Sequence, residues 1–236
     1  MNISTLQPIG KPVKVAMSNK FSDRSFKTMA KAENRLKGSY RNIVNLPISP
    51  SNVTVGMEWY AEAHQVAKTV GVLAGYHDEM AIRVGAGVLS ALSPMRDWVL
   101  NIAIAILLVT EGKQKHVKIQ HDKALAMLAG KEPISVLGDR ANKTKSFYLA
   151  IMNPNNNWSD PVLDRHAVAV YMGRSVSDKE SKALDSPNVY SRIVRAYLKA
   201  SELTGINHHA LQAMTWTQWR ENKGLSGIAT RQLAIE

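Results

Sequence analysis

Apolar residues recur at helical spacing along most of the chain, and the first clear case lies near residue 57. Ser51 or Asn52, just upstream, can cap the N-terminus of such a helix. The residues that would share its buried face are Met57, Tyr60, Ala63, His64, Ala67 and Val70. The pattern therefore predicts a long amphipathic helix in this region.

Two further apolar segments, 84–92 and 97–110, meet at Leu92-Ser93-Pro94, where the proline separates two predicted helices. Helical spacing also appears in residues 121–129, 142–152, 163–172, 187–203 and 208–221.

Start and stop residues support several of these helices. Ser186 precedes Pro187 and Asn207 precedes residue 208, as expected of N-caps, while Gly130, Gly173 and Gly205 are placed to end helices. No stretch alternates as a half-buried strand does for more than a few residues. Without an internal repeat or a glycine-rich phosphate loop, the sequence predicts an all-α fold.

Composition narrows the class of protein. The chain has 236 residues, enough for one large or two small domains, and it has no cysteine. Disulfides, thiolate metal sites and cysteine nucleophiles are therefore excluded. The longest apolar stretch, 99–109, is interrupted by Asn101 and falls short of the roughly 20 residues that span a bilayer. With no secretory signal visible, we expect a cytoplasmic protein with no membrane partner.

Charge indicates the partner. Lys and Arg outnumber Asp and Glu by 30 to 19, giving a formal charge of +11, so either a polyanion such as DNA is bound or the protein is basic without a specific ligand. We expect residues 1–41 to form a basic arm that contacts phosphates, and residues 42–236 to form the helical domain. The cations of the arm are Lys11, Lys14, Lys20, Arg24, Lys27, Lys31, Arg35, Lys37 and Arg41.

Candidate chemistry follows a loop of turn-forming residues, 153–161. There Asp164-Arg165-His166 opens a helix, and Asp164 is either a capping carboxylate or a catalytic acid. Upstream, Gly138 begins a turn that leads into a helix start carrying Lys143. That turn is either a phosphate-binding site or a solvated connection, and its other cations are Arg140 and Lys145.

The order of these features resembles the helix-hairpin-helix DNA glycosylase superfamily, of which endonuclease III is a member. A turn is followed by Lys143-Thr144 at a helix start, and then by Asp164, which opens the next helix beside an imidazole. The resemblance implies a glycosylase-like helical fold and a base-flipping pocket. It also implies that Lys143 faces an essential Asp164 across the pocket mouth. Asp164-Arg165-His166 stands where that family has Asp-Thr-His.

A third match is the loop Ser93-Pro94-Met95-Arg96-Asp97, which is similar to the loop from which those enzymes insert a side chain into the gap left by the flipped base. Met95 or Arg96 would be this wedge. Residues 59–220 also resemble a phage-encoded branch similar to the α-glutamyl/putrescinyl thymine pyrophosphorylases. The resemblance implies DNA contacts by Ser93, Met95, Arg96, Trp98, Asn101, Arg140, Lys145, Arg165, His166 and Arg220.

The chain departs from the family at the hairpin, which usually has two glycines. Here Gly138 is followed by Asp139-Arg140-Ala141, so Lys145 can take the place of Lys143 in the pocket. The iron–sulfur cluster of some members requires cysteine, and we expect no cofactor.

Three functions are consistent with these features. In base excision, Asp164 stabilises positive charge on the sugar or activates water, and Lys143 attacks the sugar carbon. In a transferase, an amine cosubstrate replaces pyrophosphate on a hypermodified thymine, with Asp164 as base and Arg140, Lys143, Lys145 and Arg165 holding the leaving group. The third is a DNA-binding module without catalysis. Each would bind double-stranded DNA with one nucleotide flipped, and the oligomeric state is not fixed.

Aromatic and histidine residues near the C-terminus admit simpler interpretations. Trp216 fits a core stripe with Leu211 and Ile206, leaving Arg220 more open. No histidine pair has i, i+4 spacing with a carboxylate partner, so we expect no metal site.

Overall fold

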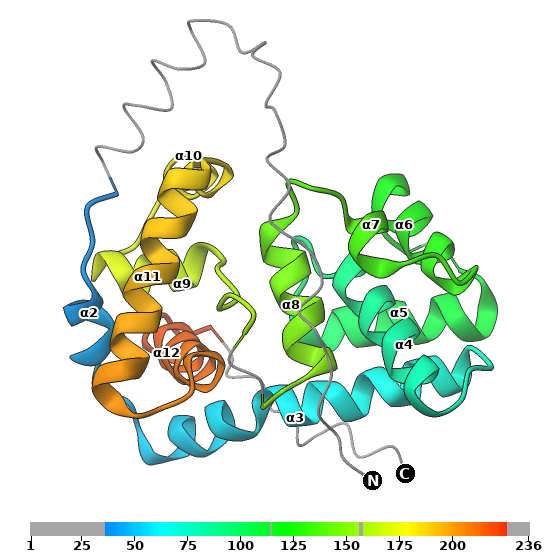
Figure 1. Ribbon diagram of the computed structural model, residues 1–236, viewed down its shortest axis with the longest axis horizontal. Coiled ribbons are helices and arrows are strands. Elements are labelled where there is room, and N and C mark those ends of the chain that lie inside the picture. The colour runs from blue at the N-terminus through cyan, green and yellow to red at the C-terminus, as the bar shows by residue number, and fades with distance from the viewer. Residues whose placement is uncertain (1–35, 114, 156–157, 226–236) are drawn as a thin grey trace, which may run out of the picture.

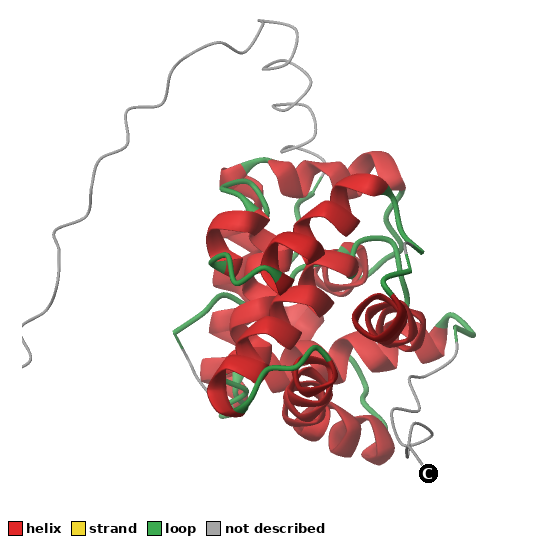
Figure 2. Ribbon diagram, turned by 90° about the vertical axis from the view of Figure 1, so that its right-hand side faces the viewer, coloured by secondary structure: helices red, strands yellow, loops and turns green. Residues whose placement is uncertain are grey.

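The structure is a computed structural model that describes residues 36–113, 115–155 and 158–225. Within these residues every regular element is a helix (Figure 2), which confirms the all-α prediction. None of the described helices is both long and apolar enough to cross a membrane.

The first lobe is built around one hydrophobic core and contains the helices in the middle of the chain (Figure 1). Trp59, Leu89, Ile104 and Ile151 are among its buried residues. Its helices are α3 (Pro50–Leu73), α4 (Asp78–Leu92), α5 (Trp98–Glu111), α6 (Lys118–Leu128), α7 (Pro133–Leu137) and α8 (Asn142–Met152).

The second lobe has its own core, which includes Leu163, Ile193 and Tyr197. Helix α3 runs beneath both lobes in Figure 1, and its N-terminal half packs against α12. The long helix thus joins the two lobes. The helices of the second lobe are α2 (Tyr40–Val44), α9 (Arg165–Met172), α10 (Asp178–Ser181), the 3-10 helix η1 (Lys182–Asp185), α11 (Pro187–Thr204) and α12 (His208–Asn222).

The predicted caps are confirmed in part. Asn207 accepts a hydrogen bond from the backbone N–H of His209, and Gly173 and Gly205 end their helices in the left-handed conformation. Helix α3 starts earlier than predicted, because Ser49 rather than Ser51 or Asn52 is its cap. Ser186 occupies the N-cap position of α11, but its side chain makes no capping hydrogen bond.

The expected boundary between arm and domain, after Arg41, falls inside helix α2. Leu36 is fully buried, and its backbone oxygen accepts a hydrogen bond of 2.8 Å from Arg192. The backbone N–H of Ser39 donates to the oxygen of Tyr171 at 3.0 Å. The folded domain therefore includes residues 36–41, and the rest of the predicted arm lies outside the described residues.

Helices α3 and α4 cross so closely that only glycine fits at two positions. A Cβ atom on Gly85 would lie 1.8 Å from the backbone oxygen of Ala67, and one on Gly71 would lie 1.9 Å from that of Ala81. In both cases the obstacle is backbone, which no side-chain rotation can move aside.

We therefore expect Gly85→Ala to lower the free energy of unfolding by ~3 kcal/mol or more, because both helices must separate. Gly87→Ala, on the same helix, is the comparison: its Cβ would lie 2.7 Å from Sδ of Met127 and 3.2 Å from the ring of Pro133, both side chains rather than backbone. Alanine also favours the helix by about 1 kcal/mol, so the loss of stability should be smaller than in Gly85→Ala. Urea denaturation of the two variants measures the difference. Equal stability would show that the helices can part at little cost.

Candidate active site in the cleft between the lobes

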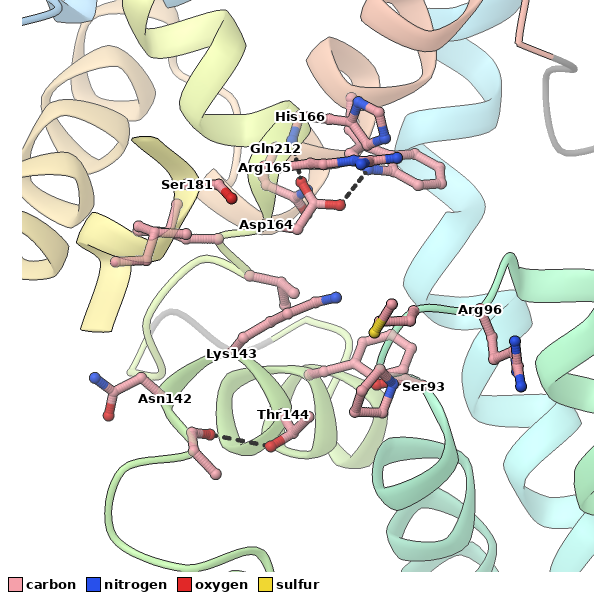
Figure 3. A pocket seen from close by; sticks show the side chains of 18 of the residues that line it. Ser93, Arg96, Asn142, Lys143, Thr144, Asp164, Arg165, His166, Ser181 and Gln212 are labelled. Carbon is pink, nitrogen blue, oxygen red and sulfur yellow. Dashed lines mark hydrogen bonds between the residues drawn. The ribbon is translucent and has the colours of Figure 1, made fainter. Parts of the chain in front are cut away.

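A cleft of about 1000 Å³ opens between the two lobes, and nearly all of the predicted site residues line it (Figure 3). The contributing elements are α3, the loop before α5, the N-terminal ends of α5, α8, α9 and α11, the short helices α10 and η1, and one face of α12. The predicted residues in its lining are Ser93, Met95, Arg96, Trp98, Asn101, Arg140, Lys143, Asp164, Arg165, His166 and Arg220.

Asp164 is the N-cap of helix α9, which confirms its capping role. Its Oδ1 accepts hydrogen bonds from the backbone N–H groups of His166 at 2.8 Å and Ala167 at 2.9 Å. Its Oδ2 accepts a third bond, from Nε1 of Trp216 at 2.9 Å. Because one oxygen completes the helix cap and the other reaches a different helix across the cleft wall, Asp164 does more than cap.

The carboxylate of Asp164 is held in its ionised form. Burial alone would raise its pKa, but the positive charge of Lys143, the proximity of His166 and the hydrogen bonds from Ala167 and Trp216 outweigh burial, so the pKa lies below its usual value. Asp164 is therefore a permanent anion at neutral pH. Such a group is suited to stabilising positive charge and poorly suited to donating a proton.

Lys143 is the lysine that faces Asp164. It lies in the first turn of α8 and projects into the cleft in Figure 3. Lys145 points elsewhere, lining a separate cavity of about 290 Å³, with its amine 3.8 Å from Oδ1 of Asp139. Of the two lysines that the sequence left as alternatives, Lys143 therefore lines the cleft and Lys145 does not, because residues two apart on a helix point in different directions.

The turn that precedes Lys143 joins two helices as a hairpin. Helix α7 ends at Leu137 and is followed by Gly138, whose φ of 91° is one that glycine adopts readily, and α8 starts at Asn142. Nζ of Lys123 donates to the backbone oxygen of Leu137 at 2.8 Å, which ties the end of α7 to α6. The hairpin thereby holds Arg140 and Lys143 at the cleft.

Four aromatic rings form the floor of the cleft. The ring of Trp59 lies 5.2 Å from that of Trp98, 5.9 Å from Phe147 and 6.4 Å from Trp216, measured between centroids. The predicted core stripe of Trp216, Leu211 and Ile206 is confirmed only in part. Trp216 packs against the first-lobe core and also lines the cleft, whereas Leu211 and Ile206 belong to the second-lobe core. The floor is a surface on which a planar ring can stack.

The loop before α5 exposes one apolar side chain at the cleft edge. Met95 is 95% exposed and has a φ of 60°, a backbone conformation that non-glycine residues adopt at some cost. Other predicted contacts in this region are largely buried: Ser93 donates to the oxygen of Ser90 at 3.0 Å, and Asn101 donates to that of Leu89 at 3.0 Å. Ser93 and Asn101 thus support the loop and helix that present Met95.

The cations of the second lobe differ in exposure. The guanidinium of Arg220 lies 4.9 Å from the centroid of the Trp216 ring, as in a cation–π contact. Arg165 is exposed and forms an ion pair of 3.3 Å with Asp178. Burial, followed by the charges of Arg165 and Arg220, lowers the pKa of His166 in spite of Asp164, so its imidazole is neutral at pH 7.

A pair of buried histidines fixes the loop that leads to Asp164. Nε2 of His208 lies 2.7 Å from the backbone oxygen of Ser159, and Nε2 of His209 lies 3.0 Å from its hydroxyl. Burial, with the charge of His208, lowers the pKa of His209 to about 3. The described residues contain no group of three side chains able to hold a metal ion.

Acidification is therefore expected to destabilise the fold well before its carboxylates titrate. Between pH 6.5 and pH 3 the unfolded chain binds a proton at His209 that the folded chain does not, so stability falls as the pH falls. From pH 7.5 to 5.5 the loss at this residue should be roughly 1–2 kcal/mol. Urea denaturation of His209→Gln should show a flatter pH dependence than the wild type.

Two polar residues of the cleft were not predicted from the sequence. Gln212 and Tyr60 both line the cleft, and the hydroxyl of Tyr60 donates to Oε1 of Gln212 at 2.8 Å. They lie 152 positions apart and meet only because α12 packs across α3. No local pattern in the sequence identified Gln212 as the partner of Tyr60.

The described region is thus a two-lobed, all-helical protein whose cleft combines an ionised aspartate, an aromatic floor and several cations. The chain belongs to a family of unknown function (DUF7178), whose model matches residues 27–223. No curated protein and no solved structure matches it.

Proposed function

We propose that this protein is a DNA-processing enzyme that flips a nucleotide into the cleft and breaks the bond between its base and sugar. The observation that carries the proposal is the position of Asp164, an anion fixed by three hydrogen bonds beside an aromatic floor and subject to the charge of Lys143. The helical hairpin α7–α8, with Lys143 in the first turn of α8, supports membership of the helix-hairpin-helix DNA glycosylase superfamily.

The chemistry follows from this geometry. As the bond between C1′ and the base nitrogen breaks, its electron pair leaves with the base and positive charge develops on the sugar. The fixed carboxylate of Asp164 stabilises that charge without having to reorganise. Either water or the amine of Lys143 then forms the new bond to C1′. The proton that the nucleophile gives up passes to the departing base, so Lys143 is a cation beside Asp164 until the reaction begins.

The rim of the cleft supports binding to nucleic acid. Six lysines and arginines line the cleft against four aspartates, so the lining is cationic overall. Met95, exposed on its loop, is placed to fill the gap that a flipped base leaves in the duplex. The aromatic floor then accepts the base by stacking.

A second candidate is a transferase that replaces pyrophosphate with an amine on a hypermodified thymine. The size of the cleft favours it, because about 1000 Å³ is at the upper end for small-molecule sites and leaves room for a base with a large substituent. In that reaction Arg140, Lys143 and Arg165 bind the pyrophosphate and Asp164 accepts a proton from the amine.

Mass analysis of nucleosides after incubation of the full chain with DNA tests both candidates. Unmodified DNA and DNA carrying hypermodified thymine are incubated with and without a polyamine. Release of free base supports excision, and a mass gain on thymine supports transfer. Binding without any change in mass would contradict both reactions and leave a DNA-binding module.

A further inference from the structure

One face of helix α12 lines the cleft from its mouth to its floor. Gln212, Trp216 and Arg220 follow one another at intervals of four residues, and all three line the cleft. Trp216 and Arg220 are partly exposed, whereas Gln212 is only 4% exposed. Gln212 is therefore the deepest of the three, on the same cleft wall as Asp164 in Figure 3.

The side-chain amide of Gln212 is fixed in one orientation. The buried hydroxyl of Tyr60 donates to its Oε1 at 2.8 Å. Burial, and then the charge of Asp164, raises the pKa of Tyr60 well above its usual value, so the phenol keeps the proton that it donates. The amide oxygen of Gln212 is occupied by this hydrogen bond, which leaves the amide nitrogen Nε2 as the group available to a ligand. No residue in the described part of the chain accepts a hydrogen bond from Nε2. Gln212 thus offers only hydrogen-bond donors to the cleft.

A donor at the floor can distinguish bases that the aromatic rings cannot. Stacking is tolerant of sequence because every base has a π-face, so discrimination depends on polar groups. A carbonyl oxygen facing Nε2 would accept a hydrogen bond. An exocyclic amino group at the same place is itself a donor, so neither it nor Nε2 would have an acceptor.

We propose that Gln212 recognises the flipped base and selects one with a carbonyl at the 4-position of a pyrimidine or the 6-position of a purine. This proposal rests on the proposed function. The depth of Gln212 indicates these positions. Asp164, which acts at the sugar, accepts a hydrogen bond from Trp216. Along α12, Gln212 lies one helical turn, about 5.4 Å, deeper in the cleft than Trp216. The exocyclic group on the side of the base away from the sugar lies at that depth.

Binding to matched duplexes tests this selection. Each duplex carries one target base opposite an abasic analogue, so that pairing does not differ between members: uracil is compared with cytosine, and hypoxanthine with adenine. Fluorescence anisotropy on ice, where turnover is suppressed, gives Kd for the full chain. We expect the oxo member of each pair to bind ~10-fold more tightly.

Two substitutions should remove this preference by different routes. Gln212→Met keeps the length of the side chain but has no donor, so the ratio of Kd values within each pair should fall to about 1. Tyr60→Phe leaves the amide free to turn its oxygen to the cleft, so the amino members should bind nearly as well as the oxo members. Gln65→Met, at an exposed position on α3, is the control and should keep the wild-type ratio.

The outcomes separate this inference from the function on which it rests. If the duplexes bind but the wild type shows no oxo preference, or if both cleft variants retain it, Gln212 is not the reader and the inference is wrong. If no duplex binds at all, the proposed function itself fails.

Discussion

Asp164→Asn is expected to lower turnover by at least ~10²-fold while leaving DNA binding intact. The substitution removes a permanent anion positioned to stabilise charge on the sugar, and an interaction of this kind is commonly worth ~10²–10³ in rate. Binding should hold or tighten, because a negative charge is removed from a site that receives phosphate-linked sugar. Single-turnover kinetics on the substrate found by nucleoside analysis, with anisotropy for Kd, measure the two effects.

The structure also predicts a cost to stability beyond the loss of a cap. Asparagine can still accept the backbone hydrogen bonds of His166 and Ala167 with its oxygen, but its amide nitrogen would then face the N–H of Trp216. An unsatisfied donor there costs about 1–3 kcal/mol, and the lost charge at the helix start costs roughly 0.3–1 kcal/mol.

The double variant Asp164→Asn/Trp216→Phe separates the two effects. Removing the indole donor should recover part of the stability that Asp164→Asn loses, whereas turnover should stay low because the anion is still absent. Full activity in Asp164→Asn would instead return Asp164 to the role of a helix cap and leave the chemistry to another group.

The sequence located the main elements of the cleft because their information is local. Residues 142–152 form α8 as the apolar spacing predicted, and Asp164 caps α9 because a carboxylate before a helix start satisfies free backbone amides. The short helices α7 and α10, of 5 and 4 residues, were missed, since so few residues cannot display a helical period.

Contacts between lobes required the structure. Lys143 and Lys145 are equivalent in the sequence, and only the orientation of α8 shows which one faces Asp164. The bond between Tyr60 and Gln212 likewise depends on the crossing of α3 and α12, which no local pattern encodes. The sequence predicts that the basic segment ends at Arg41, but the burial of Leu36 depends on packing against helices distant in the sequence.

Lys143→Met is expected to lower turnover by ~10²-fold or more, whereas Lys145→Met should leave it within about 3-fold. Both substitutions remove one positive charge from the first turns of α8, so nonspecific attraction to DNA falls equally in the two variants. They differ in position, because only Lys143 lies in the cleft and contributes to the low pKa of Asp164. Loss of this charge should also move the acid limb of the rate profile to higher pH.

Borohydride trapping identifies what Lys143 does. If its amine attacks C1′ and the base leaves, the sugar ring opens to a Schiff base, which borohydride reduces to a stable amine that joins protein and DNA. The wild type and Lys145→Met should form this adduct, and Lys143→Met should not. If base release persists in Lys143→Met while trapping is lost, water is sufficient for excision and the amine acts only after it. If the two variants lose turnover equally, the lysines act through charge alone, and a nucleophilic role for Lys143 is wrong.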